Sequence, residues 1–192
     1  MGQARKHPDL SCARPVVLVG MMGVGKTTVG RRLASRLDLP FFDADHEIEK
    51  AAGMTVSDLF AAHGEQSFRE GEARVIKRLL EGPPHVLATG GGAVVNPETR
   101  ALIAEQAVSI WIRADVDTIV KRATKRNTRP LLQNDDPRET VIRLMKEREP
   151  FYASADIHVD SHPGPHANTV ELILDALRAR PDLLTATKEP SS

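Results

Sequence analysis

The chain has 192 residues, a length typical of a single domain with a sizeable hydrophobic core. Its 26 lysines and arginines balance its 26 aspartates and glutamates, so bulk attraction to nucleic acid or to an anionic membrane is not expected. The single cysteine, Cys12, excludes an internal disulfide and suits a reducing cytosol, and no apolar run approaches the roughly 20 residues of a membrane-spanning helix.

Both ends of the chain are polar. Residues 1–15 contain no apolar segment typical of a secretion signal and are predicted to form a disordered arm. Residues 181–192 are predicted to form a flexible tail. We therefore expect residues 16–180 to form one domain, in a cytoplasmic protein without a nucleic-acid or membrane partner.

Short apolar runs alternate with helix-like runs along this domain, a pattern that predicts an α/β fold around a parallel sheet. Because the runs are continuously apolar, the strands should be covered by helices on both faces. Capping residues predict helix starts near Thr55, Asn96 and Asp136, and Gly64 and Gly82 are candidate helix ends. The predicted strands are residues 16–19, 41–42, 86–88, 108–112 and 157–159.

The first predicted strand leads into a phosphate-binding motif. Residues 20–27 read GMMGVGKT and match the pattern G-x-x-x-x-G-K-[ST]. Val29, Leu33 and Leu37 recur at helical spacing directly after it. The alternative, a glycine-rich turn that caps a helix and binds nothing, requires neither the Lys-Thr pair nor the preceding strand. The motif therefore predicts nucleotide binding.

The chemistry of such a loop assigns roles to its residues. Backbone N–H groups converge on phosphate oxygens at the start of a helix, where the helix dipole also favours anions. Lys26 is expected to reach the β- and γ-phosphates, and the Thr27 hydroxyl is expected to ligate Mg²⁺. The residues expected to bind the nucleotide here are Gly23, Val24, Gly25, Lys26, Thr27 and Thr28.

Two carboxylates, Asp43 and Asp45, follow the second predicted strand. If the strand continued, they would point to opposite sides and serve different purposes. One could lie near Mg²⁺, and the other could accept a proton from a hydroxyl substrate. Capping of the next helix by Asp45 is the structural alternative.

A triple glycine, Gly90, Gly91 and Gly92, follows the third predicted strand. A tight turn would need only one glycine, so the run favours close approach of the backbone to a small ligand. Between these motifs lie Arg69 and Glu72, whose i, i+3 spacing by itself indicates a solvated ion pair.

Cations gather near the predicted fourth and fifth strands. Residues 121–130 contain five cations, Arg122 and Arg129 among them, without interleaved aromatic residues. This composition favours a lid that closes over a triphosphate rather than a nucleic-acid surface. Arg148 precedes Pro150 at a predicted helix end, where a cation is favourable for structural reasons alone.

Together these motifs resemble those of the shikimate kinase family over residues 16 to about 177. The resemblance implies a three-layer P-loop fold of the nucleoside-monophosphate-kinase type, with five parallel strands ordered 2-3-1-4-5. It also implies transfer of the γ-phosphoryl group of ATP, with Mg²⁺, to the 3-hydroxyl of shikimate on the route to chorismate and the aromatic amino acids. The motifs that carry it are residues 20–27, 42–45, 64–69 with Glu72, 90–93, 129–132 and 148–152.

The resemblance also implies roles for individual residues. Asp45 would bind the shikimate hydroxyls and act as the base. Arg69 and Arg148 would grip the shikimate carboxylate, with Glu72 holding an arginine in place. Gly91, with Gly90 and Gly92, would donate N–H groups to shikimate, Asp43 would lie near Mg²⁺, and Arg129 and Arg122 would contact the ATP phosphates. Residues 45–74 would form the shikimate-binding insertion and residues 124–137 the lid. The resemblance also implies that the protein is a monomer.

One feature departs from the family pattern. The loop over residues 160–168 lacks the arginine that often flanks adenine in the family, so His162 or backbone groups are the candidates for that contact. The alternatives for function are another small-molecule P-loop kinase, such as a gluconate or nucleoside-monophosphate kinase, and a non-catalytic module that binds ATP. A pair of carboxylate-binding arginines argues against a nucleotide acceptor but does not exclude gluconate.

Overall fold

The computed structural model describes residues 10–124, 136–162 and 164–185. The strands in these ranges form one parallel sheet in the order β2-β3-β1-β4-β5, the order that the family resemblance implied. All the predicted strands are present, and β2, β4 and β5 each extend one residue further than predicted. Their bounds are β1 (Val16–Val19), β2 (Phe41–Asp43), β3 (Val86–Ala88), β4 (Val108–Arg113) and β5 (Ile157–Asp160).

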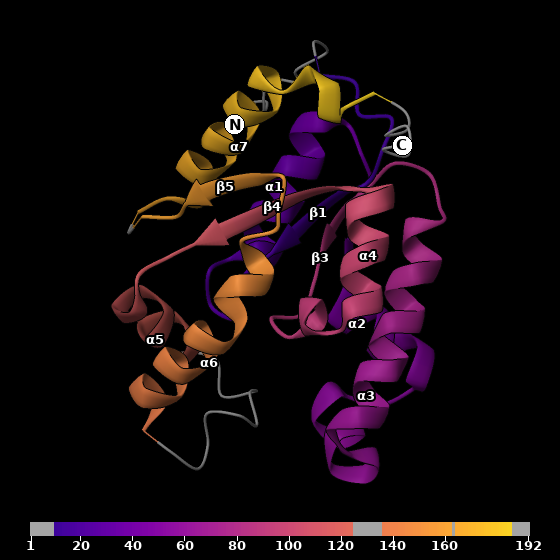
Figure 1. The fold of residues 1–192 in the computed structure, drawn as a ribbon, viewed down its shortest axis with the longest axis vertical. Coiled ribbons are helices and arrows are strands. Elements are labelled where there is room, and N and C mark those ends of the chain that lie inside the picture. Colours follow the sequence, from indigo (N-terminus) through magenta and orange to yellow (C-terminus); the bar gives the residue numbers. More distant parts are fainter. Residues whose placement is uncertain (1–9, 125–135, 163, 186–192) are drawn as a thin grey trace, which may run out of the picture.

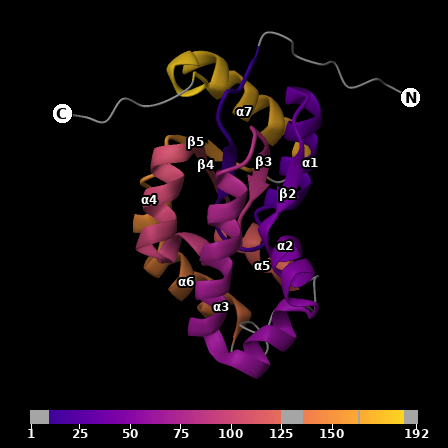
Figure 2. The same cartoon turned by 90° about the vertical axis from the view of Figure 1, so that its right-hand side faces the viewer.

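Helices lie on both faces of the sheet (Figure 1 and Figure 2). On one face α1 packs beside α7, and on the other α4 packs on β4 with α3 beside it. The α5 and α6 helices pack together beyond the carboxyl end of β4 (Figure 1). The helices are α1 (Lys26–Leu37), α2 (Ala44–Ala52), α3 (Val56–Leu80), α4 (Pro97–Gln106), α5 (Val116–Thr124), α6 (Pro137–Tyr152) and α7 (His166–Ala179), with 3₁₀ helices η1 (Ala93–Val95) and η3 (Pro181–Leu183).

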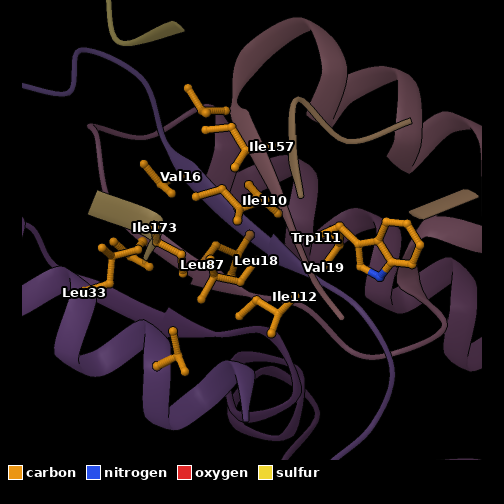
Figure 3. Packing of buried hydrophobic residues seen from close by; sticks show 14 of the residues in the cluster. Val16, Leu18, Val19, Leu33, Leu87, Ile110, Trp111, Ile112, Ile157 and Ile173 are labelled. Atoms are coloured by element: carbon orange, nitrogen blue, oxygen red, sulfur yellow. The ribbon is translucent and has the colours of Figure 1, made fainter. Parts of the chain in front are cut away.

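The core is centred on β1, which pairs with β3 on one side and β4 on the other. Val16, Val17 and Leu18 are completely buried, because helices cover both sheet faces (Figure 3). This burial explains why the strand is continuously apolar in the sequence rather than alternating.

The predicted capping residues begin their helices as expected. Thr55, Asn96 and Asp136 each accept a backbone N–H bond from the first turn of α3, α4 and α6. Gly64 does not end a helix: its φ of 74° and ψ of 173° introduce a kink inside α3. Gly82 follows Glu81, the C-cap residue of α3, and its N–H donates to the carbonyl of Leu79, as predicted for a helix stop.

The described parts of both chain ends are packed onto the domain. Leu10 and Cys12 are buried near one end of the chain, and Leu183 and Leu184 near the other. The N–H of Ala13 donates to the carbonyl of Leu184 at 2.9 Å, so the two ends also bond to each other. The prediction of a disordered arm is therefore wrong for residues 10–15, and the predicted flexible tail is wrong for residues 181–184. Isolated leucines outside a periodic run carry no secondary-structure signal that would have shown this.

No helix within the described ranges is both long and apolar enough to cross a membrane.

Candidate active site

The phosphate-loop motif forms the turn between β1 and α1. Gly20 and Gly25 have φ values of 138° and 98°, which only glycine adopts without strain. The surroundings also exclude a side chain, because a Cβ on Gly20 would lie 2.5 Å from the carbonyl oxygen of Ile112. A Cβ on Gly25 would lie 2.7 Å from Cε1 of His166. The two motif glycines are therefore required by both the backbone and the neighbouring elements.

Lys26 is buried at the start of α1, with only 8% of its surface exposed. Its Nζ donates to the carbonyl oxygens of Gly20 at 2.7 Å and Met21 at 2.9 Å. These bonds hold the ammonium group within the loop, and a carbonyl pair is a weaker partner for it than a phosphate dianion. The lysine is therefore held in the loop in a position from which it can exchange its carbonyl partners for phosphate oxygens.

The first of the two carboxylates links the phosphate loop to the end of β2. The hydroxyl of Thr27 donates to Oδ2 of Asp43 at 2.7 Å, and the Oδ1 of Asp43 accepts the N–H of Asp45 at 3.1 Å. Asp43 therefore caps α2, and the alternative in which Asp45 is the cap is wrong. The hydroxyl and carboxylate oxygens of Thr27 and Asp43 are hard ligands that fit Mg²⁺, which is bound by few protein groups together with substrate phosphates.

The second carboxylate, Asp45, lies in the first turn of α2 rather than in a continued strand. The opposite-facing geometry expected of Asp43 and Asp45 is therefore absent, and both side chains line one cavity of about 250 Å³. This cavity joins the phosphate loop to the glycine-rich turn after β3. Its lining residues are Gly23, Gly25, Lys26, Thr27, Thr28, Asp43, Asp45, Thr89, Gly90, Gly91, Arg122 and His166.

The triple glycine lets charged side chains approach the backbone closely. A Cβ on Gly90 would lie 2.7 Å from Oε1 of Glu72 and 3.1 Å from Oδ1 of Asp45. A Cβ on Gly92 would lie 2.6 Å from Cζ of Arg69. Side chains from α2 and α3 occupy the space that a Cβ would take, so a larger residue at either glycine would displace the end of a charged side chain.

The middle glycine, Gly91, lies between the phosphate loop and α6. A Cβ there would be 3.2 Å from the backbone nitrogen of Met22 and 3.4 Å from Nη1 of Arg148. The glycine turn therefore contacts the donor loop on one side and the arginine of α6 on another. Sequence motifs separated by more than 50 residues meet at this one turn.

Glu72 is the most deeply buried carboxylate of this group, with 2% of its surface exposed. Its Oε2 accepts a bond of 2.7 Å from Nη1 of Arg69, so the pair is not the solvated one that its spacing indicated. Burial raises the pKa of Glu72 above its ordinary value of 4.5, and Arg69 opposes the rise. The nearby charge of Asp45 adds to the increase, and that of Arg148 reduces it.

The two arginines line a second cavity, of about 690 Å³, bounded by α3, α6 and the start of α4. Arg148 is buried, with 6% of its surface exposed, although it carries a full charge on α6. The guanidinium of Arg69 also lies 3.5 Å from Oε1 of Glu65 and stacks near the Phe68 ring at 5.3 Å. The lining residues are Glu65, Gln66, Arg69, Val95, Asn96, Pro97, Arg143, Leu144, Glu147, Arg148 and Phe151.

The remaining predicted residues are placed as follows. Arg122 lines the phosphate-loop cavity and donates to the carbonyl of Val24 at 3.3 Å. The side chains of Val24 and His162 line a separate apolar cavity of about 470 Å³, so His162 does not line the phosphate-loop cavity. Arg129 and residues 125–135 of the expected lid lie outside the described residues.

Sequence reasoning missed three residues of this region: Thr89, Tyr152 and His166. Thr89 directly precedes the glycine run, which is a signal that could have identified it. Its hydroxyl donates to the carbonyl of Leu18 at 3.0 Å and ties β3 to β1. Tyr152 ends the family motif over residues 148–152, but no role was assigned to it. His166 has no local motif that marks it, because it reaches the site only through the packing of α7.

The fold and the site define a P-loop kinase that acts on a small molecule. The phosphate loop and the carboxylate of Asp45 line one small cavity, and the two arginines line a second cavity rather than a groove for a polymer. The family model for shikimate kinase matches residues 22–178, and the chain belongs to that family. The shikimate kinase of Bradyrhizobium diazoefficiens is 60% identical over 87% of this chain and 81% of its own length. The shikimate kinase of Caulobacter vibrioides is 56% identical over 86% of this chain and 83% of its own length.

Solved structures agree with the family. A shikimate kinase from Acinetobacter baumannii, in complex with shikimate, superposes with a TM-score of 0.85 at 34% identity and covers 87% of this chain and 94% of its own. A gluconokinase from Sinorhizobium meliloti gives a TM-score of 0.59 at 18% identity, covering 88% of this chain and 94% of its own, and shares the fold alone.

The raised pKa of Glu72 predicts a pH-dependent contribution to stability. A group whose pKa is raised in the folded state stabilises the protein below its ordinary pKa, and this contribution is lost as the pH rises through the folded value. The unfolding free energy of the wild type minus that of Glu72→Gln should therefore fall as the pH rises above 4.5, by up to about 1.4 kcal/mol per pH unit.

Urea unfolding of both proteins between pH 4 and 8 measures this difference. The matched control is Glu65→Gln, which removes the negative charge of the other, exposed carboxylate beside Arg69 and so separates the burial of Glu72 from the loss of a charge next to the arginine. A difference for Glu72→Gln that stays constant or rises with pH would contradict the assignment.

Proposed function

We propose that this chain transfers the γ-phosphoryl group of ATP to the 3-hydroxyl of shikimate and releases ADP and shikimate 3-phosphate. The observation that carries the proposal is the glycine turn over residues 90–92. The phosphate loop lies against one side of it, and Asp45, Arg69 and Arg148 lie against the others. The phosphoryl donor and a hydroxy acid acceptor would therefore bind on different sides of the three-residue glycine turn.

The donor side supports binding of a triphosphate. Backbone N–H groups of residues 23–28 surround the start of α1, where the helix dipole favours anions. Lys26 would leave the carbonyls of Gly20 and Met21 for the β- and γ-phosphate oxygens. Arg122 already lies at this cavity, and we assign Arg129 of the lid to the same phosphates through the family resemblance.

Mg²⁺ bound at Thr27 and Asp43 would supply positive charge that neutralises the triphosphate. The 2.7 Å bond between their oxygens supports this assignment, because it places the two groups side by side, and Asp43 would act directly or through water.

The acceptor side supports recognition of a carboxylate and hydroxyl groups. The forked guanidinium groups of Arg69 and Arg148 suit a bidentate grip on the carboxylate of shikimate. Glu72 holds Arg69 through the 2.7 Å bond and so acts as a positioning residue. The N–H groups of Gly91, Gly90 and Gly92 are the proposed donors to the substrate, because glycine carries no side chain of its own that would keep a small ligand from the backbone.

Asp45 is the proposed base. It lies at the cavity shared with Lys26 and Thr27, so a hydroxyl bound to it would be near the γ-phosphate position. Accepting the proton as the new P–O bond forms would avoid a positive charge on the attacking oxygen. Most of the rate enhancement would come from positioning and from cationic groups around the transferring phosphoryl group.

The organisation of the chain is part of the same proposal. Residues 16–180 make up one kinase domain, onto which residues 10–15 and 181–184 also pack. Within it, residues 45–74 would bind shikimate and residues 124–137 would close as a lid. We also propose a monomer as the active form. We place the protein in the cytoplasm, where ATP is available and the single cysteine stays reduced.

The test is an assay of ADP release from MgATP by the purified protein. Release should require shikimate and should not occur with gluconate, since residues from three separate elements are arranged around one acceptor. Equal release with gluconate would favour a different P-loop kinase. ATP binding without release in the presence of shikimate would favour a non-catalytic module.

Removal of the base should reduce turnover without weakening nucleotide binding. Asp45→Asn keeps the shape of the side chain, and we expect kcat to fall by about 10²- to 10⁴-fold while the Kd for MgATP changes little. Glu47→Gln is the matched control, because it removes another acid from the first turn of α2 without lining the cavity. A near-normal kcat for Asp45→Asn would show that Asp45 is not the base.

A methyl group at Gly92 should displace Arg69 selectively. Because the added Cβ would lie 2.6 Å from Cζ of Arg69, the end of a flexible side chain must move while the fold remains. For Gly92→Ala we expect the KM for shikimate to rise about tenfold or more, with the KM for MgATP within about twofold.

Gly71→Ala serves as the control, because a Cβ there meets no atom closer than 4.0 Å within α3. It should leave both KM values unchanged and stabilise the helix by about 1 kcal/mol. Normal shikimate affinity in Gly92→Ala would argue against a role for Arg69 in binding the acceptor.

A further inference from the structure

Tyr152, the last residue of α6, lies behind the glycine turn. Its side chain is 1% exposed, and its hydroxyl donates a hydrogen bond to the carbonyl of Gly91. The same oxygen lies 3.7 Å from Sδ of Met21 in the phosphate loop. Tyr152 therefore contacts the backbone of the acceptor side and a side chain of the donor side with one polar atom.

The hydroxyl is a hydrogen-bond donor at any pH at which the enzyme would act. Burial raises the pKa of Tyr152 to about 12, although the charge of nearby Arg148 opposes this rise. A neutral phenol that donates to a carbonyl is the arrangement that a buried tyrosine needs, because an unpaired buried hydroxyl is costly.

The hydrogen bond to the Gly91 carbonyl fixes the orientation of the whole peptide group between Gly91 and Gly92. The peptide between Gly91 and Gly92 is trans, since the described residues contain no cis bond. In a trans peptide the C=O and the following N–H point in opposite directions. Holding the Gly91 carbonyl against Tyr152 therefore turns the N–H of Gly92 away from α6.

The direction matters because glycine offers no steric resistance to rotation of this peptide. Two adjacent residues without Cβ atoms can exchange the carbonyl and N–H positions at little cost. If the carbonyl pointed into the acceptor side, it would repel a bound carboxylate or leave a substrate hydroxyl without its expected N–H donor. The turn therefore needs an external group that selects one orientation.

We propose that Tyr152 is a positioning residue for the acceptor, whose hydroxyl holds the Gly91–Gly92 peptide so that the N–H of Gly92 faces the substrate. This inference rests on the proposed function, because it concerns the binding of shikimate. It also gives α6 a double role. Arg148 and Tyr152 are four residues apart on this helix, so the carboxylate grip and the glycine turn are fixed by one rigid element.

The alternative is that Tyr152 only fills space. Its ring packs against Trp111, with ring centroids 5.8 Å apart, and this contact does not involve the hydroxyl. The two roles are separable, because replacement by phenylalanine keeps the ring and removes only the oxygen. A space-filling residue would tolerate this change in every property of substrate binding.

The test is steady-state kinetics of the full-length Tyr152→Phe variant. We expect the KM for shikimate to rise about 5- to 50-fold while the KM for MgATP stays within about twofold. Tyr152→4-aminophenylalanine, which restores a donor at the same place, should recover most of the lost shikimate affinity. An unchanged KM for shikimate in Tyr152→Phe, in an active wild-type background, would overturn the inference.

The matched control is Ser109→Ala, near the amino end of β4. Ser109 is also buried, and its hydroxyl donates to Oδ2 of Asp156 at 2.8 Å, so this variant loses a buried hydrogen bond remote from the glycine turn. It should lower the melting temperature without altering the KM for shikimate. An equal rise of that KM in Ser109→Ala would show a general effect of stability and would also overturn the inference.

Two further outcomes are distinguishable. If the wild type itself releases no ADP with shikimate, the proposed function fails rather than the role of Tyr152. If Tyr152→Phe does not fold, the 4-aminophenylalanine variant is compared with Tyr152→4-methylphenylalanine, which has similar bulk but no donor. Equal shikimate KM values for these two variants would overturn the inference, and a higher value for the methyl variant would support it.

Discussion

The pairing of β1 with β3 determines how the two halves of the site meet. Leu18 is opposite Ala88 in this parallel register, so the phosphate loop and the glycine turn begin at neighbouring points on the same sheet edge. Thr89 reinforces the alignment, because its N–H and its hydroxyl both donate to the carbonyl of Leu18, at 3.2 and 3.0 Å. A shift of one residue in this pairing would move the glycine turn along the loop and point alternate side chains to the wrong face.

The charges around the glycine turn are a second constraint. Burial of Glu72 and Arg148 is costly unless opposite charges and hydrogen bonds accompany it. Arg69 provides the hydrogen bond to Glu72, and Arg148 contributes a favourable charge. A guanidinium group held in this way has already lost most of its rotational freedom before a ligand arrives. Such preorganisation lowers the entropic cost of binding a small carboxylate.

Much of the fold could be predicted from the sequence because its signals are local. The apolar strands, the capping residues and the phosphate-loop motif each depend on a few neighbouring residues, and the strand order followed from the family resemblance. The packed chain ends could not be predicted, since Leu10 and Leu184 are buried through contacts distant in sequence. Similarly, the i, i+3 spacing of Arg69 and Glu72 indicated a solvated pair, and only packing of α3 beside the glycine turn buried Glu72.

The sequence by itself therefore determined the phosphate loop, the elements of the α/β domain and the candidate site residues in their chain order. The tertiary structure alone decided that Asp43 rather than Asp45 caps α2, that His166 lines the phosphate-loop cavity, and that Tyr152 bonds to the glycine turn. The physical reason is the range of each interaction. Propensity and motif spacing act between near neighbours, whereas burial, cavity lining and side-chain hydrogen bonds depend on which elements the folded sheet brings side by side.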